Sequence, residues 1–282
     1  MIYGYIPNEA VCLTFIVLFG VSTLLHLVQS LYFRLWWLLP TAVLAGLGEV
    51  IGWAGRYWSS QTYQGNLLDP YLMQITCTII SPTPLLAANF VILGTMIKYL
   101  GSQYSRLSPK WYSIIFCGAD IVALVIQSVG GASASSAARD DGNTENGSHI
   151  MLIGIIIQMV AIVIYVALAS EFLFRYFTKR PVRNLNDKVV EGVLDRKIKL
   201  MIFGLSLSTL CIFIRAVYRT IELTDGWDGA IITNELYFNV LDGAMIVLAI
   251  YTVNILHPGF LLSHVVMRNK EVEKFGSQET VA

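Results

Sequence analysis

Charge is scarce in this sequence. Asp, Glu, Lys and Arg make up 13% of its 282 residues, whereas hydrophobic residues make up 55%. A soluble domain of this length needs about 25% charged residues to cover its surface. The formal net charge is +0, so the chain also lacks a basic field for nucleic acid. The composition therefore indicates an integral membrane protein and gives no sign of a nucleic-acid partner.

The sequence also lacks the patterns of several catalytic and binding sites. Cysteine and histidine occur four times each, as Cys12, Cys77, Cys117, Cys211, His26, His149, His257 and His264. Every cysteine falls inside an apolar run, which argues against a disulfide framework, and no two histidines have the helical i, i+4 spacing of a zinc site. No Gly-rich phosphate loop is present, which excludes an ATP-driven pump within this chain. We expect no catalytic residues, no metal and no cofactor.

Long apolar runs dominate what is there. A helix needs about 20 apolar residues to cross roughly 30 Å of hydrocarbon. Seven segments reach that length, near residues 10–32, 35–58, 70–98, 110–132, 149–177, 199–222 and 235–257. The connections between them are too short to be folded domains. The sequence thus predicts an all-α integral membrane protein, with a single seven-transmembrane helix bundle over residues 1–260 and a short cytosolic tail at 261–282.

Basic residues gather on one side of this predicted bundle. If the N-terminus lies outside, fifteen of the nineteen face the cytosol: Arg34, Lys98, Arg106, Lys110, Arg175, Lys179, Arg180, Arg183, Lys188, Arg196, Lys197, Lys199, Arg268, Lys270 and Lys274. Cytosolic loops are enriched in Lys and Arg. We therefore predict an outside N-terminus and a cytosolic C-terminus.

Two prolines interrupt the third predicted span. Pro82 and Pro84 fall in its middle, where each removes a backbone hydrogen bond. We expect a kink or local unwinding at this point. A helix broken at mid-membrane often lines a cavity.

Ionisable residues inside the spans are costly and mark either a pairing network or a pathway. The second span carries Glu49 and Arg56, and the sixth carries Arg215 and Glu222, again seven apart but with the signs reversed. If these helices are neighbours, Glu49 pairs with Arg215 and Arg56 with Glu222. This predicts an inner layer with the first pair and an outer layer with the second pair and Arg219.

The seventh span adds Glu235, Asn239 and Asp242 on one helical face. We expect Glu235 in the outer layer and Asp242 in the inner layer, where two acids then share one base. One acid must be protonated or must hold a cation. Because Glu49 has Arg215 as a partner by depth, we assign the amine of an amphiphilic ligand to Asp242, with Asn239 one turn away.

Further polar residues lie at other depths of the spans. The full set of candidate substrate-binding or transport residues is Glu49, Arg56, Gln74, Asp120, Gln127, Gln158, Arg215, Arg219, Glu222, Glu235, Asn239 and Asp242. Two interpretations stay open. The charges either only fasten the bundle through buried pairs, or line a cavity open to the outer leaflet.

The order and spacing of these residues form a recognisable pattern. Its pieces are Glu49-x-x-Gly52-Trp53-x-x-Arg56, Gln74 with Ser81-Pro82-Thr83-Pro84, Asp120 with Gln127-x-x-Gly130-Gly131, Gly154-x-x-x-Gln158, Arg215-x-x-x-Arg219-x-x-Glu222-x-x-x-Gly226-x-x-Gly229, Glu235, Asp242 and His257-Pro258-Gly259. The pattern resembles the fungal RTA-like, or lipid-translocating exporter, family over nearly the whole chain. Asn89 and Asn239 depart from it, at positions where the family often has an aromatic residue.

The resemblance implies a seven-span protein that moves amphiphiles, such as sphingoid long-chain bases or sterol-like compounds, between leaflets or out of the cell. Membrane lipids or amphiphilic small molecules are thus the expected partners, and the plasma membrane is the expected location. The endoplasmic reticulum and the vacuole stay open, as does the oligomeric state. A seven-span sensor or receptor for such lipids is the main alternative function, and an intramembrane lipid hydrolase is a weaker one.

Overall fold

The computed structural model describes residues 5–61, 68–140, 142–182, 192–225, 229 and 231–262. These residues form helices and connecting turns, with no strand among them, and seven helical segments are long and apolar enough to cross a membrane. The prediction of an all-α, seven-span membrane protein is therefore confirmed. The tail from residue 263 onward and Gly226 lie outside the described residues, as do five of the basic residues used for orientation, Arg183, Lys188, Arg268, Lys270 and Lys274.

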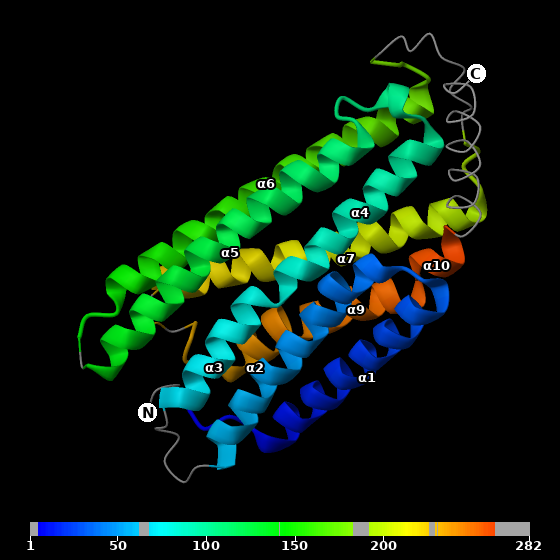
Figure 1. Ribbon diagram of the computed structural model, residues 1–282. Helices are drawn as coiled ribbons and strands as arrows, with labels where there is room; N and C mark the ends of the chain where they lie inside the picture. The colour runs from blue at the N-terminus through cyan, green and yellow to red at the C-terminus, as the bar shows by residue number, and fades with distance from the viewer. Residues whose placement is uncertain are drawn as a thin grey trace, which may run out of the picture.

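The spans lie side by side in an elongated bundle, and consecutive helices pack against one another (Figure 1). The first span is α1 (Glu9–Phe33), and the second comprises η1 (Trp36–Leu38), η2 (Leu39–Val43) and α2 (Leu44–Gln61). The third comprises α3 (Leu68–Ile80) and α4 (Pro82–Leu100), and η3 (Ser102–Tyr104) follows it. The fourth to sixth are α5 (Pro109–Arg139), α6 (Glu145–Thr178) and α7 (Arg196–Asp225). The seventh comprises α8 (Glu235–Tyr237), η4 (Phe238–Ala244), α9 (Met245–Ile255) and α10 (Pro258–Leu261).

The third span is broken where the sequence predicts it. Helix α3 ends at Ile80 and α4 begins at Pro82, with Ser81 between them. Pro82 has no N–H to continue the ladder, and the Ser81 hydroxyl donates to the Cys77 carbonyl at 2.5 Å. Two neighbouring spans are also irregular, because η2 and η4 are π-helices. Segments of this kind often lie at functional sites.

Small residues hold α5 and α6 close together along much of their length (Figure 1). A Cβ added to Gly154 of α6 would lie 2.7 Å from Gln127 Cγ and 2.9 Å from the Ala123 carbonyl oxygen, both on α5. Without side-chain bulk at this position the two helices approach closely, as in many membrane bundles. This hairpin forms one side of the molecule.

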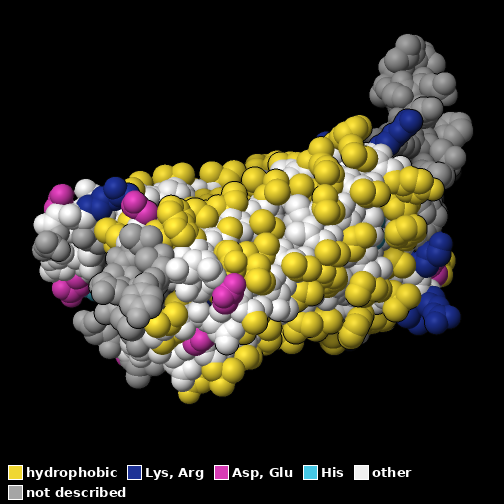
Figure 2. All heavy atoms as spheres, turned by 90° about the horizontal axis from the view of Figure 1, so that it is seen from below, with side chains coloured by type: hydrophobic (Ala, Val, Ile, Leu, Met, Phe, Trp, Pro, Cys, Tyr) yellow, Lys and Arg dark blue, Asp and Glu magenta, His cyan; other side chains and the backbone are white. Residues whose placement is uncertain are grey.

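The surface fits a lipid environment. Leu24 and Val28 of α1 are each 63% exposed, and apolar side chains cover most of the middle of the face in Figure 2. In water such a continuous apolar surface would be an aggregation site, whereas in a bilayer it is solvated by lipid tails. Most visible Lys and Arg side chains in Figure 2 gather at one end of the bundle, here called the basic end. Helix α5 begins and α6 ends there, so this end carries Arg106, Lys110 and Lys179 (Figure 1). The chain is an integral membrane protein.

Candidate functional site

Arg219 of α7 is the centre of a buried charge network. Its Nε and Nη2 atoms lie 2.9 and 2.8 Å from the two carboxylate oxygens of Asp242 on η4. Its Nη1 lies 2.7 Å from Glu222 Oε2, and Nη2 also donates to the Thr78 hydroxyl of α3 at 2.8 Å. The Arg219 side chain is 1% exposed. A guanidinium bound in this bidentate way ties α3, α7 and the seventh span together.

Asp242 has a second arginine partner. Arg215 Nε lies 2.8 Å from Asp242 Oδ1, and Arg215 Nη2 donates to the Thr78 carbonyl. The predicted meeting of Asp242 and Arg215 is confirmed. The predicted association of Arg219 with Glu222 in the outer layer is confirmed. The predicted separation of that layer from Asp242 is wrong, since Arg219 binds both acids. Regular α-helical spacing could anticipate neither the π-helix η4 nor the reach of an arginine side chain.

Arg56 of α2 forms the outer part of the network. Its Nη2 atom lies 3.3 Å from Glu235 Oε1 and 2.8 Å from the Tyr5 hydroxyl, while Nη1 lies 3.5 Å from Gln74 Oε1. The guanidinium carbon also lies 4.4 Å from the centroid of the Phe238 ring. The predicted association of Arg56 with Glu235 is confirmed, and Gln74 joins them.

Besides Tyr218, whose hydroxyl donates to Glu222, three members of this network are absent from the candidate set. Thr78 binds both α7 arginines, Tyr5 binds Arg56, and the Phe238 ring lies between Arg56 and Arg219, at 5.1 Å from the second guanidinium carbon. A threonine, a tyrosine and a phenylalanine are common in membrane spans and near their ends. Only their spacing from the charged residues in three dimensions identifies them.

The two predicted pairs between the second and sixth spans are wrong. Glu222 is bound by Arg219 and by the Tyr218 hydroxyl at 2.9 Å, not by Arg56. Glu49 forms no ion pair with any described residue. The reason is the position of Thr78 on α3, which lies between the helices that carry these residues.

Helix α3 separates α2 from α7 at this level. A Cβ on Gly52 of α2 would lie 2.7 Å from Thr78 Cγ2, so α2 packs directly on α3. On its other side Thr78 accepts hydrogen bonds from both α7 arginines, at its carbonyl from Arg215 and at its hydroxyl from Arg219. The α7 guanidinium groups therefore turn toward the seventh span for their carboxylates.

Glu49 is the surplus acid of the network. The four carboxylates are Glu49, Glu222, Glu235 and Asp242, and the three bases are Arg56, Arg215 and Arg219. Glu49 is 1% exposed, and its Oε1 atom has no hydrogen-bond partner among the described residues, although Asp242 and the α7 arginines lie within electrostatic range. The prediction of a ligand amine at Asp242 rests on the premise that Arg215 pairs with Glu49. That premise is wrong, because Arg215 forms its ion pair with Asp242.

Asn239 lies apart from these contacts. It is half-buried on η4, and its Oδ1 atom has no hydrogen-bond partner among the described residues. It is near Asp242 in sequence but contributes no contact to the arginine pairs.

The remaining candidates form a second polar cluster between α4, α5 and α6. Gln158 Nε2 donates to the Thr83 hydroxyl at 2.8 Å, and Gln127 Nε2 lies 3.4 Å from Gln158 Oε1. Asp120 of α5 is 2% exposed, and neither of its carboxylate oxygens has a hydrogen-bond partner among the described residues. The twelve candidates thus divide into two separate groups and two residues that join neither, Asp120 and Asn239.

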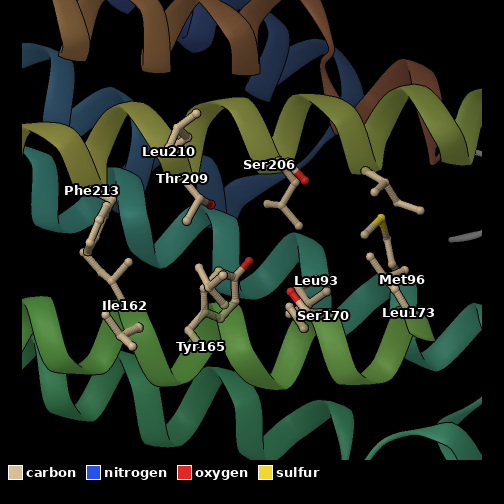
Figure 3. Close-up of a pocket in the computed structure, with 15 residues that line it drawn as sticks. Leu93, Met96, Ile162, Tyr165, Ser170, Leu173, Ser206, Thr209, Leu210 and Phe213 are labelled. Carbon is tan, nitrogen blue, oxygen red and sulfur yellow. The ribbon is translucent and has the colours of Figure 1, made fainter. Parts of the chain in front are cut away.

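A groove of about 500 Å³ lies between α4, α6 and α7 (Figure 3). Its lining is mostly apolar and contains no charged residue. Four hydroxyl-bearing side chains face it, Tyr165 and Ser170 from α6 and Ser206 and Thr209 from α7. The sequence gives no indication of this groove, because isolated serines and threonines in apolar helices form no distinctive pattern.

In the part of the chain that the structure describes, no three His, Cys, Asp or Glu residues gather in a way that could hold a metal ion.

The family model described as RTA1 like protein matches residues 42–264. The chain belongs to this family. The resemblance seen in the sequence is confirmed.

Curated relatives of this RTA1-like protein are fungal. "Sphingoid long-chain base transporter RSB1" of Saccharomyces cerevisiae is 33% identical over 91% of this chain and 73% of its own length. "Protein RTA1" of the same yeast is 29% identical over 69% of this chain and 57% of its own length. "Lipid-translocating exporter-like protein RTA1" of Leptosphaeria maculans is 25% identical over 92% and 51%, respectively. No solved structure matches the chain.

The family match covers every candidate residue in this RTA1-like chain. The charged residues of the network, the glutamine cluster and the groove fall inside residues 42–264. Tyr5, which binds Arg56, lies before the matched region.

Proposed function

We propose that this protein moves amphiphilic lipids of the sphingoid long-chain-base class between leaflets or out of the cell. The observation that carries the proposal is the 33% identity, over 91% of the chain, with a protein named as a transporter of such bases. Two of the relatives are named as a transporter and as an exporter-like protein, so we propose transport and no catalytic role.

The charge network supports a cationic lipid as the substrate. A sphingoid base carries an ammonium group, and the network has four carboxylates for three arginines. A buried carboxylate without an ion-pair partner is costly, and a cation beside it lowers that cost. We therefore place the ammonium at Glu49, whose Oε1 atom has no hydrogen bond to a described residue. Asp242 is a poorer choice, since both of its oxygens already contact arginine.

Access to Glu49 requires the bundle to open, because the residue is buried. Glu49 lies on the second span, which packs against the third around Gly48 and Gly52, and Asp242 of the seventh span is within electrostatic range. Each of these three spans departs from regular α-helix, at η2, at Ser81 and at η4. We propose that these segments are where the spans shift during transport. Irregular helices lining a mid-membrane site are a recurring feature of transporters.

Orientation and compartment are part of the same proposal. We place the N-terminus outside, the basic end and the tail at 261–282 in the cytosol, and residues 1–260 in one bundle in the plasma membrane, with the endoplasmic reticulum and vacuole as alternatives. The gathering of Lys and Arg at the basic end supports this sidedness (Figure 2). Protease protection of tags placed after Ala282 and near Asn143 tests it, and a protected tag near Asn143 with an accessible one at the C-terminus in intact cells would reverse it.

Reconstitution tests the transport function directly. Purified protein in sealed phosphatidylcholine vesicles should accelerate the exchange of fluorescent sphinganine between leaflets, measured with a membrane-impermeant quencher. Protein-free vesicles and vesicles with an unrelated seven-span protein are the controls. Exchange no faster than in the controls contradicts transport, and binding without exchange favours the lipid sensor.

A further inference from the structure

The groove between α6 and α7 has the shape of a chain-binding slot. It extends from Ile162 to Leu173 along α6 and from Ile202 to Phe213 along α7, with Leu93 and Met96 of α4 as its floor. Eleven residue steps of helix give a length of about 16 Å. Figure 3 shows the two facing helices with side chains directed into the space between them.

The rim of the groove opens to the surface of the bundle. Val163 of α6 and Leu210 of α7 both line the groove, and both are about half exposed. This surface lies within the spans, so lipid hydrocarbon and not water is outside. A lipid chain can therefore enter sideways between α6 and α7.

The hydroxyl groups in the groove behave differently from those elsewhere in the spans. Thr95, Thr220 and Thr252 donate to the carbonyl four residues earlier, at 2.9, 2.9 and 2.6 Å, which satisfies a hydroxyl in lipid. Ser170 and Ser206 are exposed in the groove and make no hydrogen bond to any described residue. A hydroxyl in hydrocarbon without a partner is unfavourable, so these two serines are available to a polar group of a ligand.

The inner wall of the groove is also polar. Tyr165 and Thr209 are buried there, and the Tyr165 hydroxyl lies 3.4 Å from the Asn89 carbonyl oxygen. Asn89 Nδ2 donates to the Ser208 and Thr209 hydroxyls at 3.2 Å each. These bonds fix the wall of the groove and leave the two serines as its adaptable polar pair.

We propose that this groove binds one hydroxyl-bearing, single-chain lipid, with the lipid's head hydroxyls on Ser170 and Ser206 and its chain along the apolar slot toward Ile162 and Phe213. Ser170 lies about 12 Å from the end of α6 at Thr178, which suits a head group near the membrane interface at the basic end. The lining holds no acid, so the groove recognises hydroxyls and hydrocarbon and is separate from Glu49. The lipid class rests on the proposed function.

Filling the slot tests the proposal with a matched pair of variants. Ala169 lines the groove, while Ala167 lies two residues earlier on the same helix, is exposed and does not line it. Ala169→Trp should weaken the binding of radiolabelled sphinganine to purified protein in phosphatidylcholine nanodiscs by at least about tenfold, a change of about 1.4 kcal/mol. Ala167→Trp should bind as the native protein does. Equal binding by the two variants, at native unfolding midpoints, overturns the proposal.

Removing the hydroxyls tests the head-group contact even if the tryptophan variant unfolds. Native protein should bind sphinganine more tightly than deoxysphinganine, and Ser170→Ala combined with Ser206→Ala should abolish that preference. An unchanged preference contradicts the hydroxyl contact. If Ala169→Trp instead changes the oligomeric state in light scattering and leaves sphinganine binding intact, the groove is an interface between copies and the proposal is wrong.

The two proposals fail separately. If the native protein binds sphinganine in the groove but does not accelerate its exchange, transport is wrong and the site stands. If it transports sphinganine and both tryptophan variants bind and transport normally, transport stands and the site is wrong.

Discussion

The charge network and the groove are opposite in construction. The network joins four spans through arginines that are almost wholly buried and bound on several sides, whereas the groove contains no charge and opens to the lipid phase. Buried charges in a membrane keep a fixed geometry, because each lost partner leaves another group unsatisfied. In a groove lined by hydroxyls and apolar side chains, one lipid can replace another at a small cost in free energy. We infer from this difference that the network provides rigidity, that Glu49 is the position where it can take up a cation, and that the groove provides adaptable binding.

Removal of Arg219 should have the largest effect on stability. Arg219→Leu leaves Asp242 with one partner and Glu222 without its arginine. Loss of one member of such a buried network costs about 3–5 kcal/mol, so we expect little folded protein in chemical unfolding from detergent micelles. The control is Arg139→Ala, which removes an exposed pair with Asp69 and should leave the midpoint almost unchanged. Similar losses in both variants would mean that the network is not the stabilising region.

The two inner acids should differ when each is neutralised. Asp242→Asn removes the charge that binds Arg215 and Arg219, and should destabilise the protein by about 2–3 kcal/mol. Glu49→Gln should change the free energy of unfolding by less than about 1 kcal/mol, since no described residue forms an ion pair with Glu49. Unfolding midpoints measured in parallel decide this. If Glu49→Gln destabilised the protein more than Asp242→Asn, Asp242 and not Glu49 would be the acid without an arginine partner.

The wall of the groove depends on how α6 packs against α5. Gly154→Leu forces a side chain against Gln127 and the Ala123 carbonyl, and overpacking of this kind costs about 1–3 kcal/mol. Gly118→Leu on α5 is the matched control, because a Cβ there meets nothing within 4 Å. Thermal unfolding should separate the two variants. If Gly154→Leu unfolded at the same temperature as Gly118→Leu, α6 would be free to move away from α5.

The smallest expected effect concerns the glutamine cluster. Thr83→Val removes the acceptor of the Gln158 hydrogen bond and should cost about 1 kcal/mol. Thr95→Val, in which only a bond within α4 is lost, should cost less. A loss at Thr83 as large as that of Arg219→Leu would place this cluster, and not the arginine network, at the structural centre of the bundle.

The sequence predicts most of the fold and part of the network. Seven apolar runs suffice to predict seven spans, and the prolines of the third run suffice to predict the irregularity of that span at Ser81. Helical spacing correctly brings Glu235 to Arg56 and Asp242 to Arg215. It fails for Glu49, since no one-dimensional pattern shows that α3 separates α2 from α7.

The groove could not be predicted for a different reason. Its serines have no charge, and a slot between two helices depends on how far apart those helices lie. Spacing along one helix does not contain that distance. Only the facing positions of Ser170 and Ser206 across α6 and α7 make them a candidate pair (Figure 3).

The amine specificity of Glu49 tests the central claim most directly. Leaflet exchange of fluorescent sphinganine and of its uncharged N-acetyl analogue should be compared in vesicles containing native protein or Glu49→Gln. Native protein should favour the amine, and Glu49→Gln should lose that preference at an unchanged unfolding midpoint, because the carboxylate that meets the ammonium is gone. A folded Glu49→Gln variant that still favours the amine would contradict the account.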